Sequence, residues 1–290
     1  MAFEIGVLFA LGALIGWGFG DFLIQRSVRK LGDWEPLLII TAFGAVALTP
    51  FVYGEIHSLV LASDYSFLVL LGASFVIFLT AIIDFEALRI GKIAVVEPVY
   101  SLEVPVSALL AFVVIGEVLE PLHTALVVTL MIGILMVSMR SRHFSRRVWL
   151  EKGAALAALA ALFQGTTNFM VGIASRETSF LITNWFMSLF IALVCAFYII
   201  MHKRTHKLVQ HLNENKRLLV TVSIFDNIAW IFFAAALTLT PIAIAVGISE
   251  SYIALAALLG IIVNKEKLLT HQKFGLLLAL LGAVTLAIVY

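Results

Sequence analysis

Residues 65–92, YSFLVLLGASFVIFLTAIIDFEALRIGK, form an apolar run followed by two cations, Arg89 and Lys92. A helix needs about 20 predominantly apolar residues to cross the hydrocarbon core of a membrane, and residues 65–88 supply them. Nine further segments have the same character: 5–25, 34–54, 93–115, 122–139, 153–175, 179–200, 217–239, 241–263 and 272–290. The sequence therefore predicts an all-α membrane protein with ten transmembrane helices.

The positive charges alternate between the loops. Eighteen of the nineteen Lys and Arg residues follow the first, third, fifth, seventh and ninth segments, and only Arg176 lies in a loop between them. We call these two sets the odd loops and the even loops. Short loops rich in Lys and Arg stay on the cytoplasmic side. We therefore expect a multi-pass protein of the cell (inner or plasma) membrane, with the even loops and both termini outside the cytoplasm.

The composition excludes several other classes of protein. The 290 residues are 62% hydrophobic and 13% charged, more apolar than a soluble domain of this length could bury. Residues 1–6 carry no cation, so we expect the first segment to be a permanent span and not a cleaved signal peptide. Cys195 is the only cysteine, and the histidines lie in loops or at span ends. We expect no metal site, cofactor or nucleic acid; the expected partners are the lipid bilayer and a small-molecule substrate.

The two halves of the chain resemble each other weakly. A shift of about 149 residues places residues 91–137 over 240–287, with Glu117 on Glu266, and a slightly smaller shift places residues 20–22 over 167–169. We infer two five-helix repeats, 1–140 and 153–290, joined by a basic cytoplasmic linker at 141–152. An odd number of helices per repeat gives the halves opposite orientations, the inverted repeat common among secondary transporters.

Several motifs resemble the EamA branch of the drug/metabolite transporter superfamily, and the resemblance covers essentially the whole chain. They are Trp17-Gly18, Glu97-Pro98 through Pro105, Ile115-Gly116-Glu117, and Glu266. The resemblance implies two inverted five-helix repeats that move small metabolites by alternating access, with helices 1–4 and 6–9 around a central cavity. It also makes Glu117 and Glu266, with Pro98 and Pro105, a structural signature. Characterised relatives tend to have cytoplasmic termini, whereas the charge pattern here places them outside.

Acidic side chains lie inside the predicted spans, where no Lys or Arg lies deep. They are Asp21, Asp84, Glu97, Glu103, Asp226 and Glu250. An ionised carboxylate near the bilayer centre costs roughly 2.5 to 3.5 kcal/mol, so these groups should face protein or water. At about 1.5 Å per residue, Glu103, Asp226 and Glu250 come nearest the midplane. Midplane sites at a repeat interface are where such folds bind substrate.

Neutral polar and aromatic residues complete the candidate site. Tyr100 shares a helix face with Glu103, and Tyr252 follows Glu250. The residues expected to bind substrate or couple protons are Glu103, Glu250, Asp226, Glu97, Tyr100, Tyr252, Asp21, Trp17, Asn168 and Gln164. A protonated, purely structural carboxyl is the alternative for Glu103 and Glu250, and helix packing is the alternative for Trp17. For Asp21 and Asp84 the alternative is pairing with Arg26 or Arg89 at the membrane interface. Acids without deep bases favour an amine or zwitterion over an anion. We predict a transporter of an amine-bearing metabolite such as an amino acid, proton-coupled or facilitative.

Two other functions stay open at this point, although we expect no enzyme. Residues 18–21 match the Gly-x-Gly-Asp element of intramembrane aspartyl proteases, with Asp84 as partner for Asp21, but the other protease motifs are absent from the sequence. A non-transporting membrane scaffold would need neither buried acids nor paired prolines. Gly275 and Ala279 form a small-xxx-small face that could pack against another subunit, which makes a homodimer a further option.

Overall fold

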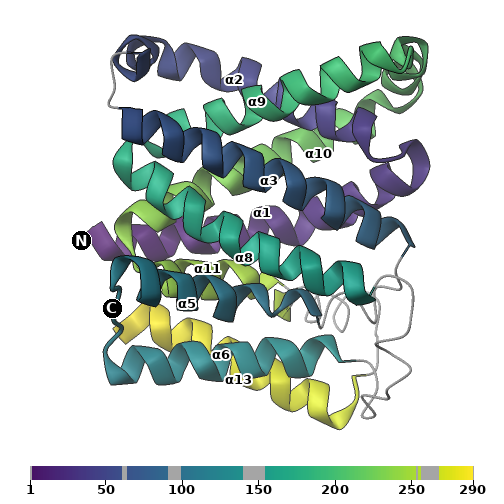
Figure 1. Cartoon of the computed structure of the whole chain (residues 1–290). Helices are drawn as coiled ribbons and strands as arrows, with labels where there is room; N and C mark the ends of the chain where they lie inside the picture. Colours follow the sequence, from purple (N-terminus) through teal and green to yellow (C-terminus); the bar gives the residue numbers. More distant parts are fainter. Residues whose placement is uncertain are drawn as a thin grey trace.

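The computed structural model describes residues 2–60, 64–90, 99–139, 154–252, 254–255 and 268–289, and every regular element among them is helical. In chain order the helices are α1 (Ala2–Leu31), α2 (Trp34–Val60), α3 (Asp64–Ile90), α5 (Glu103–Ile115), α6 (Pro121–Ser138), α8 (Ala154–Glu177), α9 (Phe180–Met201), α10 (Thr205–Leu239), α11 (Ile242–Glu250) and α13 (Thr270–Val289). They lie side by side in one bundle, with both chain ends at the same end (Figure 1). The predicted all-α, ten-helix architecture is confirmed.

Seven of the described helices are long and apolar enough to cross a membrane: α1, α2, α3, α6, α8, α9 and α10. The apolar stretches of α5 and α13 are shorter. Parts of the predicted spans 93–115 and 241–263 lie outside the described residues, namely 93–98, 253 and 256–263. The length and composition of the described helices are those of a multi-pass membrane protein.

Contacts between helices repeat when the two halves are exchanged. The first half runs from α1 to α6 and the second from α8 to α13. Helices α1, α3 and α5 of the first half correspond to α8, α10 and α11 of the second. The contact of α1 with α10 therefore corresponds to that of α8 with α3, and the contact of α5 with α8 corresponds to that of α11 with α1. The equivalent helices α2 and α9, α5 and α11, and α6 and α13 pack on each other. Figure 1 shows α2 with α9 along one side of the bundle and α6 with α13 along the other. The halves are thus interleaved, as the inverted repeat requires.

Helices α6 and α13 approach each other closely through glycines. A Cβ placed on Gly133 would meet the Ala279 nitrogen at 2.4 Å, and one on Gly282 would meet the Leu130 Cβ at 3.0 Å. The 149-residue shift exchanges Gly133 with Gly282 and Leu130 with Ala279, so the two contacts are equivalent. Gly275 also faces the backbone of α6. The small-residue face, for which packing against a second subunit was one option, is therefore filled within the chain, and it gives a homodimer no support.

The fourth helix of the first half is interrupted beside Glu103. Residues 101–102 form a turn in which the Leu102 amide donates to the Val99 carbonyl at 3.1 Å, and α5 starts at Glu103. Pro105 explains the break, because it has no N–H to donate to the carbonyl of Ser101. In the first turn of α5 the missing N–H costs little, since amides there have no helical partner. The sequence predicts a span over 93–115, and the structure adds that its described part is interrupted at residues 101–102.

The fourth helix of the second half is interrupted at the equivalent position. Helix α11 ends at Glu250, and the Ser251 amide donates to the Ile248 carbonyl at 3.2 Å. The Ser249 and Ser251 hydroxyls each donate to a backbone carbonyl at 2.5 Å. Serine hydroxyls that bond to the backbone compete with the helical ladder, so this break needs no proline. Glu103 therefore begins a helix, and Glu250 ends one.

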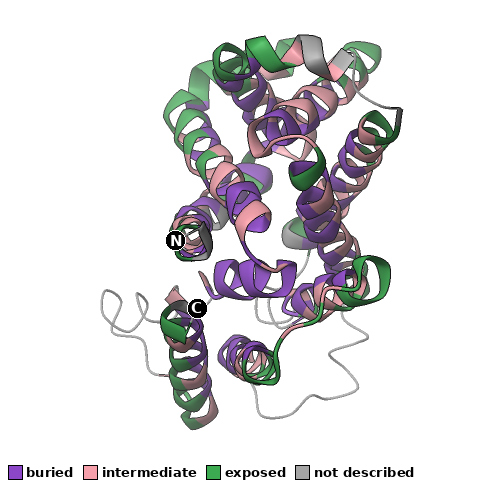
Figure 2. Ribbon diagram, turned by 90° about the vertical axis from the view of Figure 1, so that its left-hand side faces the viewer, coloured by how far each residue is buried: buried purple, intermediate pink, exposed green. Residues whose placement is uncertain are grey.

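Helix α11 lies in the interior of the bundle. Each of its residues, from Ile242 to Glu250, is buried. Figure 2, seen approximately along the helices, shows buried residues where helices face one another and exposed residues on the outer surface. The outward side chains are largely apolar, such as Phe51, Phe112 and Phe197. Apolar residues on both the inner and the outer surface are what a lipid environment requires.

Candidate functional site

Two acids from opposite halves of the chain meet between α5 and α11. Glu103 is 6% exposed and Glu250 is 5% exposed. Their carboxyl groups lie within hydrogen-bonding range of each other, and the carboxyl of Asp84 on α3 is near enough to act electrostatically on both. The sequence placed these acids at similar depth, and the structure brings them into one polar cluster at the repeat interface.

Helix α8 extends this cluster with two amide side chains. Asn168 is fully buried, and its Nδ2 donates to Glu103 Oε2 at 3.4 Å. Gln164 Nε2 donates to Asn168 Oδ1 at 3.0 Å. The hydroxyls of Thr80 and Thr167 lie 2.8 Å apart and join α3 to α8 next to the cluster. A chain of polar contacts therefore runs from Gln164 through Asn168 and Glu103 to Glu250.

Gly165 allows α8 to come close enough for these contacts. A Cβ at this position would lie 2.6 Å from the Val106 Cβ and 2.7 Å from the carbonyl oxygen of Glu103. Asn168 follows Gly165 by three residues and so lies on the same side of α8. The close crossing of α8 over α5 therefore positions the Asn168 amide against the Glu103 carboxyl.

A second polar position lies on α10, within an aromatic cluster. The Asp226 carboxyl lies near the side chain of Trp230, one turn further along. Trp230 packs edge-on against Trp17 with ring centroids 5.4 Å apart, and Trp17 also packs against Phe233 at 4.9 Å. Trp17 is 6% exposed, and these contacts are those of a packing residue. Tyr252 lies next to this cluster, since its Cβ would be 3.9 Å from a Cβ on Gly18.

The other candidates are placed only in part. The Tyr100 hydroxyl donates to the Asp84 carbonyl oxygen at 3.4 Å, near the glutamate pair. Glu97, Pro98, Glu266 and the side chain of Asp21 lie outside the described residues. The structure therefore gives no geometry for a carboxylate dyad of Asp21 with Asp84. It places the Asp84 carboxyl within electrostatic range of Glu103 and Glu250 instead.

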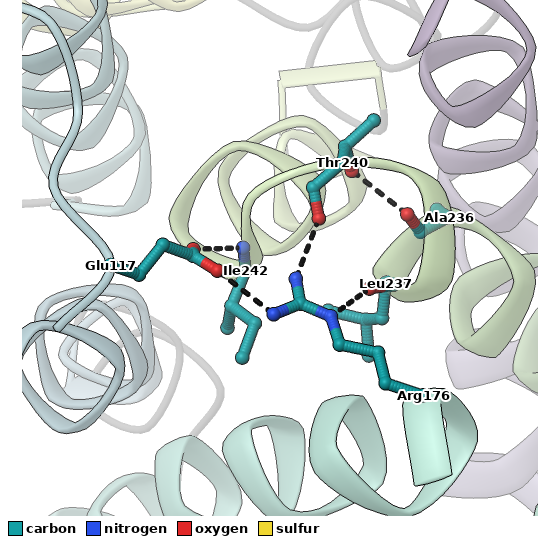
Figure 3. A network of polar contacts seen from close by, with 6 residues as sticks. All are labelled: Glu117, Arg176, Ala236, Leu237, Thr240 and Ile242. Atoms are coloured by element: carbon teal, nitrogen blue, oxygen red, sulfur yellow. Dashed lines mark hydrogen bonds and ion pairs between the residues drawn. The ribbon is translucent and has the colours of Figure 1, made fainter. Parts of the chain in front are cut away.

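Glu117 and Arg176 form a polar network at the even-loop end of the bundle (Figure 3). Glu117 follows Gly116, whose φ of +66° ends α5 in the left-handed conformation that glycine favours. Glu117 Oε1 accepts from the Ile242 amide at 2.5 Å, and its Oε2 accepts from Arg176 Nη1 at 3.0 Å. Arg176 Nε and Nη2 donate to the carbonyls of Leu237 and Thr240, each at 2.9 Å.

Arg176 is not among the candidate site residues that the sequence predicts. The signal was present, because it is the one cation in an even loop, and the acid Glu117 lies in another even loop. The structure explains the exception to the charge pattern: the guanidinium serves one carboxylate and two carbonyl groups. Glu117 has the contacts of a residue that ties loop backbone together.

Comparison with known proteins agrees with this architecture. Among solved structures, 29 chains match this one. One of them, described as "Crystal structure of protein", aligns over 98% of this chain and 96% of its own length, with a TM-score of 0.74 and 16% sequence identity. Likeness at that identity shows the fold alone. Among curated proteins, none matches this chain.

A family model decides the identity. The model of the EamA-like transporter family matches residues 4–139 and again residues 151–288, once in each half. The resemblance noted in the motifs is thereby confirmed, and the protein is a multi-pass membrane protein with a two-repeat architecture. The chain belongs to the EamA-like transporter family, within the drug/metabolite transporter superfamily.

Proposed function

We propose that this transporter carries a small amine-bearing metabolite, such as an amino acid, and that Glu103 and Glu250 form the site for its cationic group. The family supports a membrane transporter of small molecules. The substrate class is our inference from the glutamate pair. The observation that carries it is the meeting of two buried carboxyls, one from each half, at the repeat interface.

Two carboxyls in contact and away from water do not both stay ionised, because like charges at that distance repel strongly. They share a proton or bind a cation. The groups that act electrostatically on them in the described part of the chain are acids, and Asn168 supplies only a neutral amide. An ammonium group that enters the site replaces the missing positive charge. A proton displaced by it would couple transport to the proton gradient.

The amide side chains of Gln164 and Asn168 fit a site that binds a cation. Asn168 fixes one oxygen of Glu103, and Gln164 fixes Asn168, so the carboxyl is oriented before the substrate arrives. An oriented carboxyl loses less conformational entropy on binding a cation. An anionic substrate would instead meet the field of three acids, Asp84, Glu103 and Glu250.

Flux measurements in proteoliposomes test this proposal. The full chain is reconstituted and offered amino acids, polyamines, neutral sugars and organic phosphates, with protein-free liposomes as the control. We expect flux of an amine or zwitterion, faster when a pH gradient is applied. Flux of an organic phosphate with none of any amine would contradict the proposed substrate class, and an absence of all flux would count against transport by this chain alone.

We also propose that the even-loop end faces the outside of the cell, from the distribution of Lys and Arg. Val118 lies in an even loop and is 74% exposed. In a chain without Cys195, Val118→Cys should react with a membrane-impermeant thiol reagent on intact cells. Reaction only after the membrane is opened would reverse the orientation.

A further inference from the structure

We propose that the Glu117–Arg176 network is a gate that closes the Glu103–Glu250 site at the even-loop end. The inference rests on the proposed function, since only a transporter needs its site to open at alternate ends. It assigns Glu117 a role beyond that of a static structural tie. Figure 3 shows the residues that carry it.

Glu117 is the part of this network that joins the two halves. Arg176, Leu237, Thr240 and Ile242 all belong to the second half, and their mutual contacts stay within it. Glu117 is the one labelled residue from the first half, and its two oxygens contact the Arg176 guanidinium and the Ile242 amide. When one half rocks against the other, contacts between halves at one end must break. The two contacts of Glu117 are therefore among those that opening at this end would have to release.

The network also lies directly over the candidate site. Helix α11 begins at Ile242, which Glu117 contacts, and ends at Glu250, about 12 Å further along at 1.5 Å per residue. A carboxylate at a helix N-terminus is favourable for the helix dipole and satisfies an amide that has no helical partner. Ile242 is fully buried, so its amide would lose its partner if Glu117 left without water taking its place. Breaking the network therefore goes together with admitting water to this end.

The seam between α2 and α9 behaves differently, because it is tied at both ends. Ser179 Oγ donates to Glu55 Oε2 at 2.8 Å at the even-loop end. Arg204 Nη2 donates to Glu35 Oε2 at 2.9 Å at the odd-loop end, where Glu35 is fully buried. Because polar contacts join α2 and α9 at both ends, they favour neither the state open at the even-loop end nor the state open at the odd-loop end. It provides a matched control at the same end as the gate.

The odd-loop end of α1 lines a pocket. This pocket has a volume of about 390 Å³ and is lined by Gln25, Arg26, Arg29 and Lys30. Gln25 lies seven residues after Gly18 and so on the same face of α1. A Cβ on Gly18 would lie 3.5 Å from the Leu255 side chain, in the segment after Glu250. Gln25 is thus a reporter position for the odd-loop end, on the side of α1 that faces the second half.

Two cysteine reporters test the gate without knowledge of the substrate. In a Cys195→Ala chain, Ala243→Cys reports on the even-loop end, because Ala243 is 4% exposed and shares the Glu250 face of α11. Gln25→Cys reports on the odd-loop end. The full chain is placed in lipid nanodiscs, where both ends meet the reagent, and the rate of maleimide labelling is measured. We expect Glu117→Gln to raise the rate at Ala243→Cys about tenfold and to lower the rate at Gln25→Cys.

Opposite changes in the labelling rates at the two reporters distinguish a gate from a static structural contact. Arg176→Met should give the same pair of changes, whereas Glu55→Gln should leave both rates as they are. Faster labelling at both reporters would mean general loosening and would overturn the gate, as would unchanged rates in Glu117→Gln. Opposite changes in a chain without any substrate flux would support the gate and count against the proposed function. Full substrate flux with unchanged labelling rates would support the proposed function and overturn the gate.

Discussion

Glu103→Gln and Glu250→Gln are each expected to lower substrate flux by roughly 100-fold in proteoliposomes, or about 2.7 kcal/mol of lost stabilisation. Either change keeps the shape of the side chain but leaves a single carboxyl to bind the cation or the proton. Asn168 still contacts residue 103, so the orientation of the site is preserved while its charge is altered. Initial rates at equal amounts of reconstituted protein measure the effect.

The matched control for these variants is Glu120→Gln. Glu120 is a carboxylate on the surface, with a side chain 80% exposed, and its loss should change flux by less than about twofold. Thermal unfolding in detergent checks that the Glu103 and Glu250 variants remain folded. If both variants are folded and transport at the unsubstituted rate, the glutamate pair is not the binding site.

The second large effect is expected from Gly165→Ala. The added Cβ would approach the Glu103 carbonyl oxygen to 2.7 Å, and backbone does not move aside as a side chain does. Overpacking of this kind costs about 1 to 3 kcal/mol, which is at least as large as the roughly 1 kcal/mol that alanine gains over glycine in a helix. Helix α8 must shift away from α5, which separates Asn168 from Glu103. We expect a lower unfolding temperature and loss of most flux.

Gly72→Ala is the control for this substitution, since Gly72 lies on α3, which also packs against α8. Its Cβ would meet only the end of the Met170 side chain, at 3.3 Å, and a methionine can adjust. This variant should be as stable as the unsubstituted chain, or slightly more so, and should transport normally. Equal stability and flux of the two alanine variants would show that the close crossing of α8 and α5 does not position the site.

The spans were predictable because the bilayer demands a fixed apolar length, but the ends of the helices were not. The predicted span 217–239 lies within α10, which begins at Thr205. The added residues 205–216 are mostly polar or charged, so hydropathy does not register them as part of a span. Asn215 departs from helical geometry at the junction, with φ of −125°. Hydropathy indicates which part of a helix lies in lipid, but it does not indicate whether the helix continues into water.

The composition of the site was more predictable than its geometry. The cost of placing carboxylates in lipid singled out Glu103 and Glu250 from the sequence. Their direct contact depends on the rotation of α5 and α11 about their axes, which is set by packing between the halves and by the breaks beside each acid. Pro105 made the first break visible in the sequence. The second is made by serines, whose hydroxyls bond to the backbone in unbroken helices as well, as Ser74 does in α3.

The small-residue face on α13 shows a similar limit to what the sequence predicts. The spacing of Gly275 and Ala279 correctly indicates a close helix contact, but periodicity does not say which helix supplies the other side. In the structure that helix is α6, where Gly133 allows the approach. A contact that the spacing also allowed between subunits is therefore made within one chain.

Substrate binding in a double-mutant cycle tests the central claim most directly, using an amine identified by the flux measurements and the variants Glu103→Gln, Glu250→Gln and the two combined. If the two acids form one site, each single variant should weaken binding about 30-fold, and the double variant should bind within about threefold of the weaker single variant. A double variant weakened by the product of the two losses, roughly 900-fold, would mean two independent positions. That result would contradict a shared site between the halves.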